Sequence, residues 1–478
     1  MGKLKDWWTY NPEKEEASLD SVHKPLTEDK LRSGKSLLVL GFTWGFLITG
    51  LLIGGEIGPK MPFLTGTVPA ILIGTTVLFI VASLIGLIGY KIRGTNDMVY
   101  QFAYGKSGRW LPGIFLIIIT MGFQGIIVGG AASFIINDTS NPAYFWVALV
   151  LGLIFTYTAY RGISAIEKVA NPSMILLIGI SLFALLFSIR EAGGFMAFND
   201  QTIALSSQGD GPMGLAMATN LVIGSWIAGA LFASDFTRFA KSKAVAIGLC
   251  FTCLFVSQIL LIVVGAVGAA ITGTHDFTVY LTSFSPIVGI LAIITMILAM
   301  WTTSNTNLYF PAAQVAIGFK RPFKVAVLIL GLIATLMGAF GFFNVFAGFI
   351  NWIGNIMPPI AGPIIADFWL IHRTKYESKH LGKLPKYNAA AIIAAFVGIV
   401  FTFSATGISS LGIEPVEALT SSWIIPAVLG LVVSITAYVI IHATFSLAGK
   451  KVGYSSVLNK GNSEKQELGN ISYKETIL

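Results

Sequence analysis

The segment Gly224-Ser225-Trp226-Ile227-Ala228-Gly229 lies halfway along an apolar stretch that is long enough to cross a membrane. A second segment with glycines at both ends, Gly41-Phe42-Thr43-Trp44-Gly45, lies inside the first such stretch of the chain. Every backbone polar group in a bilayer needs a partner, so irregular backbone survives there only where it lines a cavity. Paired interruptions therefore predict unwound helices around a binding site. The alternative is that the glycines only allow close helix packing.

Composition places the chain among polytopic membrane proteins. Its 478 residues are 55% hydrophobic and only 11% charged, whereas soluble proteins are about 25% charged. The polar tail 1–35 does not resemble a cleaved signal peptide. The net charge of +8 follows topology and does not indicate nucleic-acid binding. Cys250 and Cys253 lie in an apolar segment, where they are expected to be buried packing residues.

Twelve apolar stretches are candidates for membrane-spanning helices, since about 20 residues cross the hydrocarbon core. They are 36–55, 65–90, 110–136, 144–160, 170–189, 214–237, 246–272, 284–309, 323–341, 343–371, 388–409 and 422–446. With the N-terminus in the cytoplasm, every Lys and Arg except Lys60 and Arg190 falls on the inside. Both tails are therefore predicted to be cytoplasmic, in the plasma membrane.

The two interrupted segments fall in the first and sixth spans, which run in opposite directions. This arrangement predicts two five-helix repeats of inverted topology followed by two extra helices. The predicted units are the tail 1–35, a first repeat 36–190, an external loop 191–213, a second repeat 214–371, a cytoplasmic loop 372–387, two additional helices 388–446 and the tail 447–478.

Chemistry inside the spans favours ion-coupled or facilitated transport. No complete phosphate-binding loop is present, and no soluble stretch is long enough for a nucleotide-binding domain. The spans carry no paired carboxylates or histidine cluster, so an intramembrane enzyme is not expected. The eighth span carries Trp301-Thr302-Thr303-Ser304-Asn305-Thr306-Asn307, and such hydroxyls with freed carbonyls suit sodium. Proton coupling usually leaves a titratable group in the interior. Here Glu56, Asp235 and Asp367 lie toward span ends.

Aromatic residues offer a way to hold a planar substrate. Trp226 and the third-span segment Gly122-Phe123-Gln124-Gly125 are candidates to face one cavity. Stacking of a base on an aromatic ring contributes roughly 1–3 kcal/mol. The alternative is an ordinary aromatic contact in the core.

At these residues the chain resembles the nucleobase:cation symporter-1 family, which includes the bacterial cytosine permeases. Four stretches carry the resemblance: Leu40-Gly41-Phe42-Thr43, residues 224–239, residues 301–309 and residues 358–367. The resemblance implies an all-α, LeuT-like fold with a 5+5 inverted repeat plus two helices, and sodium-coupled uptake of a nucleobase or related heterocycle. It also implies that Phe123 and Trp226 stack on the substrate ring.

The same resemblance implies a sodium site, with Na⁺ as the coupling ion and no covalent cofactor. Its ligands would be the carbonyls of Gly41, Trp44 and Ala299 with the hydroxyls of Thr302 and Thr303. Spacing to Gly54-Gly55 differs by about two residues from the family pattern, so the first-helix ligands are the least defined.

The chain departs from cytosine permeases at the ring edge. Thr120 stands where they carry Gln, Ala228 where they carry Ser, and Ser304 where they carry Asn. Cytosine, another pyrimidine, a purine, an allantoin- or hydantoin-like ring and a hydroxymethylpyrimidine therefore stay open, as does proton coupling. The predicted edge contacts are Gln124, Ser304 and Asn305, and the predicted cytoplasmic gate contains Asp235 and Arg238. The expected partners are the heterocycle and membrane lipids, with no nucleic acid and no obligate protein partner.

Overall fold

The computed structural model describes residues 25–136, 138–161, 176, 178–183, 185–208, 213–272, 286–408, 411–421 and 423–458. Residues 1–24 of the predicted tail 1–35 and residues 459–478 of the predicted tail 447–478 lie outside these residues, as do most of the connection before the fifth span and the first residues of that span. Within the described residues the regular structure is helical, and the β contact is a single isolated bridge between Ile408 and Ile413.

Helices in the described residues fall in all twelve predicted ranges, and ten of these ranges hold a candidate span. In the described residues, eight helices pass the length and hydropathy test for a span: Phe63–Ile92, Trp110–Ser133, Pro142–Arg161, Lys243–Ile271, Ile287–Ala316, Phe342–Ile371, Ala389–Thr406 and Pro426–Leu447. Two further candidates are bent pairs, Gly34–Gly45 with Ile48–Lys60 and Ile178–Glu191 with Phe195–Ser206. The remaining two ranges hold the shorter apolar helices Leu215–Leu231 and Phe323–Ala339.

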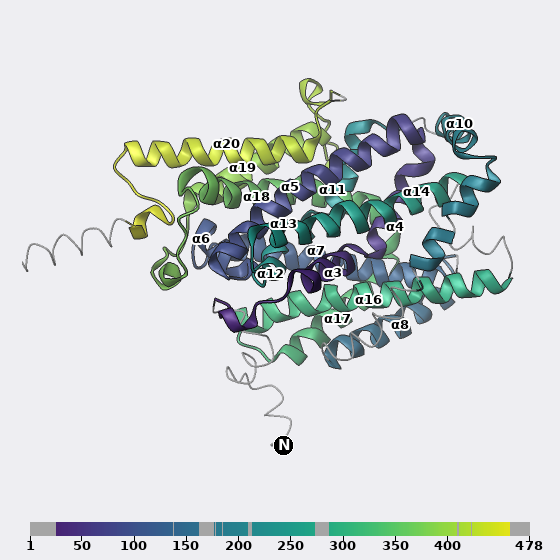
Figure 1. The fold of residues 1–478 in the computed structure, drawn as a ribbon, viewed down its shortest axis with the longest axis horizontal. Helices are drawn as coiled ribbons and strands as arrows, with labels where there is room; N and C mark the ends of the chain where they lie inside the picture. Colours follow the sequence, from purple (N-terminus) through teal and green to yellow (C-terminus); the bar gives the residue numbers. More distant parts are fainter. Residues whose placement is uncertain are drawn as a thin grey trace, which may run out of the picture.

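Two groups of packed helices form the body of the molecule (Figure 1). In the first group, α4 (Ile48–Ile57) packs along α14 (Ile259–Thr272), and α5 (Val68–Ile92) packs along α11 (Leu215–Leu231). The second group contains the helices α7 (Trp110–Ser133), α8 (Pro142–Arg161), α16 (Pro286–Gly318) and α17 (Phe323–Ala339).

Three further helices cover the first group. They are α18 (Phe346–Ile365), α19 (Ala389–Thr406) and α20 (Pro426–Leu447), and α18 packs directly on α11. In Figure 1, α19 and α20 form one edge of the molecule while α8, α16 and α17 form the opposite edge. Helices α7 and α11 and the start of the first span lie between these two edges.

The first span is broken near its centre. Helix α3 (Gly34–Gly45) ends before Phe46, helix α4 begins at Ile48, and the two axes differ by 45°. Phe46 and Leu47 leave the helical region of backbone conformation. The Ser257 hydroxyl donates a hydrogen bond of 2.7 Å to the carbonyl of Phe42. A neighbouring helix thus supplies a donor for backbone that the break would leave unsatisfied.

The prediction that the sixth span unwinds at residues 224–229 is wrong. Helix α11 runs without interruption from Leu215 to Leu231, and Trp226 lies inside it. The chain turns only at Phe232, after which the short helix α12 (Ala233–Thr237) follows. The Ser225 hydroxyl donates to the carbonyl of Val222 in the same helix. Its hydrogen bond is therefore compatible with a continuous helix.

The glycines of both segments serve close packing. A Cβ atom on Gly45 would lie 2.0 Å from the carbonyl oxygen of Cys253, and one on Gly224 would lie 2.3 Å from that of Ile350. Real Cβ atoms essentially never approach other atoms this closely. The glycines therefore let α3 approach the π-helical segment η4 (Thr252–Gln258), and let α11 approach α18.

The predicted external loop 191–213 contains a helix, α10 (Phe195–Ser206). Asn199 and Thr202 of this helix accept hydrogen bonds from the backbone N–H groups of Leu64 and Phe63. The polar side chains of α10 therefore cap the start of the second span, which begins at Phe63.

Candidate functional site

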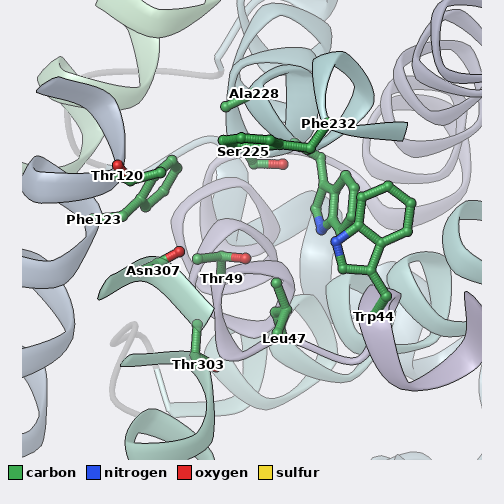
Figure 2. Close-up of a pocket in the computed structure, with 12 residues that line it drawn as sticks. Trp44, Leu47, Thr49, Thr120, Phe123, Ser225, Ala228, Phe232, Thr303 and Asn307 are labelled. Carbon is green, nitrogen blue, oxygen red and sulfur yellow. The ribbon is translucent and has the colours of Figure 1, made fainter. Parts of the chain in front are cut away.

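A pocket lies between the two helix groups, beside the break in the first span (Figure 2). Its walls come from the α3–α4 break, α7, α11 and α16. The lining residues are Trp44, Leu47, Thr49, Thr120, Phe123, Ser225, Trp226, Ala228, Gly229, Phe232, Thr303 and Asn307. The pocket therefore joins the first, third, sixth and eighth spans, as the sequence pattern predicts.

Aromatic side chains form two sides of this pocket. Figure 2 shows Phe123 and Trp44 on opposite sides. The indoles of Trp44 and Trp226 pack edge to face, with ring centroids 4.7 Å apart. Phe123 in turn packs edge to face against Phe349 of α18, at 5.7 Å. Both predicted stacking residues thus line the pocket, and each is supported from behind by another ring.

Gly229 gives the Trp226 indole its position. A Cβ atom on Gly229 would lie 2.1 Å from the ring of Trp226. The indole therefore lies over the helix surface one turn further along α11, where only a glycine leaves room for it. The second glycine of the 224–229 segment shapes the pocket without unwinding the helix.

The hydroxyl groups of the pocket present acceptors to a ligand. Thr120 donates to the carbonyl of Leu116 at 2.8 Å, and Ser225 donates to that of Val222 at 2.7 Å. Because their protons are used inside their own helices, their remaining lone pairs are free to accept. Thr49 Oγ1 and Trp226 Nε1 are buried and have no partner in the described part of the chain, so these two groups offer donors.

The three predicted edge contacts lie behind the pocket wall. Gln124 donates from Nε2 to the Ser304 hydroxyl at 2.6 Å, and both side chains are fully buried. Asn305 accepts a hydrogen bond of 2.8 Å from Thr158 of α8. These contacts tie α16 to α7 and α8, and none of the three residues lines the pocket in this structure.

Asn307 is a pocket residue that the sequence interpretation missed. It stands four residues after Thr303 on α16, and positions four apart share one face of a helix. Thr120 and Phe123 are three apart and share a face of α7 in the same way. Helical spacing from Thr303 would thus have selected Asn307 in place of Ser304 and Asn305, which point away from this face.

The five residues assigned to the sodium site lie on α3 and α16. The hydroxyls of Thr302 and Thr303 both donate to the carbonyl of Ala299, at 2.8 and 3.0 Å, so three oxygens of α16 are grouped together. Gly41 and Trp44 lie in α3, and Trp44 is one residue from the end of that helix. The nearby carbonyls of Thr43 and Gly45 accept from Phe46 and Leu47, whereas the Trp44 carbonyl has no hydrogen bond within the described residues. Carbonyl and hydroxyl oxygens of this kind are what a small hard cation binds.

Asp235 and Arg238, the predicted gate residues, lie where α11 and α12 meet α6 (Asn96–Tyr104). Asp235 accepts a 2.8 Å hydrogen bond from the backbone N–H of Asn96, at the start of α6. The guanidinium of Arg238 lies over the ring of Phe239 at 4.8 Å. The Asp235 side chain therefore joins the end of the sixth span to α6, while the Arg238 side chain packs on the residue that follows it.

Comparison with known proteins identifies the family of the chain. A model described as a permease for cytosine and purines, uracil, thiamine and allantoin matches residues 63–430. The chain belongs to this permease family. The resemblance to nucleobase:cation symporters is thereby confirmed, and the chain is a membrane transporter rather than an enzyme.

Individual relatives of the permease agree with this assignment. It is 29% identical to the cytosine permease of Escherichia coli K12 over 386 residues, which cover 80% of this chain and 87% of the relative. It is 24% identical to the allantoin permease of Bacillus subtilis over 437 residues, covering 81% and 86%. The inward-facing structure of Mhp1 superposes with a TM-score of 0.72 at 18% identity, covering 91% of this chain and 95% of Mhp1. The predicted all-helical, LeuT-like fold is confirmed.

Proposed function

We propose that this permease imports a small planar nitrogen heterocycle of the nucleobase type across the cytoplasmic membrane, together with Na⁺. The observation that carries the proposal is one pocket that contains Phe123, Trp226, a broken first span and Thr303. Rings on two sides suit a flat aromatic or lactam ring, and nearby oxygens suit the ion.

The substrate ring lies between Phe123 and Trp226 in this proposal. Thr120 and Ser225 accept from N–H groups at the ring edge, because their own protons are already donated within α7 and α11. Asn307 and the Trp226 indole N–H serve ring carbonyls or unprotonated ring nitrogens. Sites built from such polar groups reject mismatched ligands strongly. The chain has Thr120 and Ala228 where cytosine permeases carry Gln and Ser, which favours a ring other than cytosine.

The ion binds at the Trp44 carbonyl and the hydroxyls of Thr302 and Thr303, with the carbonyls of Gly41 and Ala299 as further ligands. Support comes from Trp44, which contributes one group to each site. Its indole packs on Trp226 at the substrate site, and its carbonyl, a proposed ion ligand, has no other partner within the described residues. Ion binding then orders the break that holds the substrate ring, so each ligand raises the affinity of the other.

The proposed orientation in the membrane follows from the charges of the chain. The distribution of Lys and Arg favours a cytoplasmic location for both tails. In this orientation Asp235 and Arg238 lie at the cytoplasmic end of the sixth span, where we propose that they belong to the inner gate.

A thermal-shift screen on the purified permease identifies the substrate. Cytosine, uracil, purines, allantoin, hydantoin and a hydroxymethylpyrimidine are compared, each in sodium and in choline. A ligand at about 100 times its Kd stabilises the folded state by about 2.7 kcal/mol. We expect at least one heterocycle to raise Tm, and more in sodium. If no heterocycle shifts Tm in either salt, the substrate class is wrong.

Uptake into proteoliposomes decides the coupling ion. With the substrate from the screen, an inward sodium gradient is expected to drive accumulation that choline does not support. Equal accumulation in choline under an inward proton gradient would reject sodium and establish the proton-coupled alternative.

A further inference from the structure

A polar cluster far from the pocket lies where α18 ends, in the π-helical segment η6 (Ala366–Ile371). The carboxylate of Asp367 is fully buried and accepts hydrogen bonds from the hydroxyls of Tyr376 and Tyr438. His372 Nδ1 lies 3.2 Å from the same carboxylate and 3.0 Å from the Asp367 carbonyl oxygen. Three elements, η6, the following loop and α20, therefore meet around one buried acid.

The chain segment 453–458 closes over this cluster after α20 has ended. Tyr454 is fully buried, and its ring packs against Phe102 of α6 and against His372. Val457 is also buried. The Ser455 hydroxyl contacts Nε2 of His372 at 2.9 Å and Nε2 of His442 at 3.1 Å. One serine thus bridges two imidazoles, one on each side of the docked segment.

Counting protons shows what this bridge tolerates. His372 Nδ1 faces two acceptors and therefore carries a proton. The Ser455 hydroxyl has a single proton, so it donates to one Nε2 atom and accepts from the other. The bridge is complete when one imidazole brings an Nε2 proton and the other does not. This holds whether His372 is neutral or is a cation paired with Asp367.

A second added proton breaks the pattern. Both Nε2 atoms then donate to Ser455, whose own proton loses its acceptor. Two positive charges face each other at a ring-centroid separation of 6.2 Å, and Asp367 balances one of them. The docked segment loses a hydrogen bond and gains repulsion.

We propose that His372 and His442, bridged by Ser455, form a proton-binding site that controls docking of segment 453–458. The segment stays docked while the pair holds at most one extra proton, and it is released when the pair holds two.

The groups that face the pair support this assignment. Burial lowers the pKa of His372, but the hydrogen bond and charge of Asp367 outweigh it and leave that pKa raised. Taken alone, the raised pKa stabilises docking at low pH and loses its effect as pH rises through it. Release on acidification must therefore come from the second proton. Burial raises the pKa of Tyr454 to about 12, so this hydroxyl stays protonated. The other titratable or charged groups facing the cluster are Tyr376, Tyr438, His380 and Glu377.

His380 provides a matched control. Its Nδ1 contacts the Tyr454 hydroxyl at 2.7 Å, and the Lys375 carbonyl lies within 3.3 Å of the same hydroxyl. Tyr454 can therefore turn its proton to Lys375 when Nδ1 of His380 carries a proton. Protonation of His380 leaves the docked arrangement intact.

Hydrogen exchange of the full-length permease tests the proposal. The amides of Ser456 and Val457 bond within the segment, to the carbonyls of Gly453 and Tyr454, and Tyr454 and Val457 are buried only while the segment is docked, so exchange of these amides follows its release. Between about pH 7.5 and about pH 5.5, corrected for intrinsic rates, we expect their protection to fall at least about tenfold. His442→Gln keeps a donor near Nε2 without a charge, and should abolish the fall. His380→Gln should retain it. Ser455→Ala should lower protection at both pH values.

Amides within α19 serve as the folding reference in every variant. Three results would overturn the proposal: a wild-type segment whose protection is the same at both pH values, a pH step that persists in His442→Gln, or a step that disappears in His380→Gln. The readout involves no transport, so the result is independent of the proposed substrate and ion.

Discussion

The first and sixth spans carry the same sequence pattern and adopt different backbones. Each has two glycines around an aromatic residue near mid-span, at 41–45 and 224–229. The first span breaks at Phe46 and Leu47, whereas α11 continues through Trp226 to Leu231. In both spans the glycines allow another backbone or ring to approach, as the close distances from Gly45 and Gly229 demonstrate.

The difference lies in what surrounds each helix. At the first span, Ser257 of the adjacent π-helical segment donates to the Phe42 carbonyl just before the break. The hydroxyls inside the two segments do not make this difference, because Thr43 and Ser225 both donate to carbonyls of their own helices. A glycine pair therefore predicts close approach, while a break requires an outside donor for the freed carbonyls.

The largest expected effect is on the packing of the first span. Gly45→Ala places a methyl group 2.0 Å from the Cys253 carbonyl, which is backbone and cannot rotate away. We expect the free energy of unfolding to fall by about 3 kcal/mol or more, read as a lower Tm and a lower yield of folded permease.

Gly248→Ala is the matched control, in the helix Lys243–Phe251 that precedes η4 and also packs on α3. Its Cβ would meet the flexible end of Leu38 at 3.0 Å, so Tm should stay within a few degrees of wild type. Equal Tm values for the two variants would contradict the close approach of α3 and η4.

Next in size is the effect of Trp226 on substrate binding. Trp226→Ala removes one stacking surface and is expected to weaken binding by up to about 100-fold, or about 3 kcal/mol. Isothermal titration of the purified variant measures this. Trp352→Ala, at an exposed position on α18, should bind as wild type does. Normal affinity in Trp226→Ala would reject the stacking role of α11.

The smallest expected effect comes from the donor at the break. Ser257→Ala leaves the partly buried Phe42 carbonyl without this donor, which costs about 1 kcal/mol. Ser434→Ala removes a buried hydroxyl that donates to the Leu431 carbonyl of its own helix at 2.9 Å, and should cost less. Chemical denaturation of the two variants compares them. The same loss in both would mean that Ser257 has no special role at the break.

Sequence predicted the fold well because long apolar runs and the placement of Lys and Arg are direct consequences of the bilayer. It also selected Phe123, Trp226, Trp44 and Thr303, all of which line the pocket. It placed a break in the sixth span wrongly, because the close contact of Gly224 with Ile350 is tertiary and the room that Gly229 leaves for the Trp226 ring depends on a side-chain conformation. It chose Ser304 and Asn305 because they follow Thr303 directly in the sequence. On a helix, however, the residue that shares the pocket face with Thr303 is Asn307, four positions further on.

The coupling of substrate to sodium tests the central claim most directly. The substrate Kd is measured in sodium and in choline for wild type, Thr303→Ala and the control Thr295→Ala, whose buried hydroxyl bonds to Leu291 on the same helix. Wild type and Thr295→Ala are expected to bind at least about five times more tightly in sodium, and Thr303→Ala equally in both salts. The account would be contradicted if wild type had the same substrate Kd in sodium and in choline, or if sodium tightened substrate binding to Thr303→Ala as much as to wild type. Either result would mean that substrate and ion do not share a site at the first-span break.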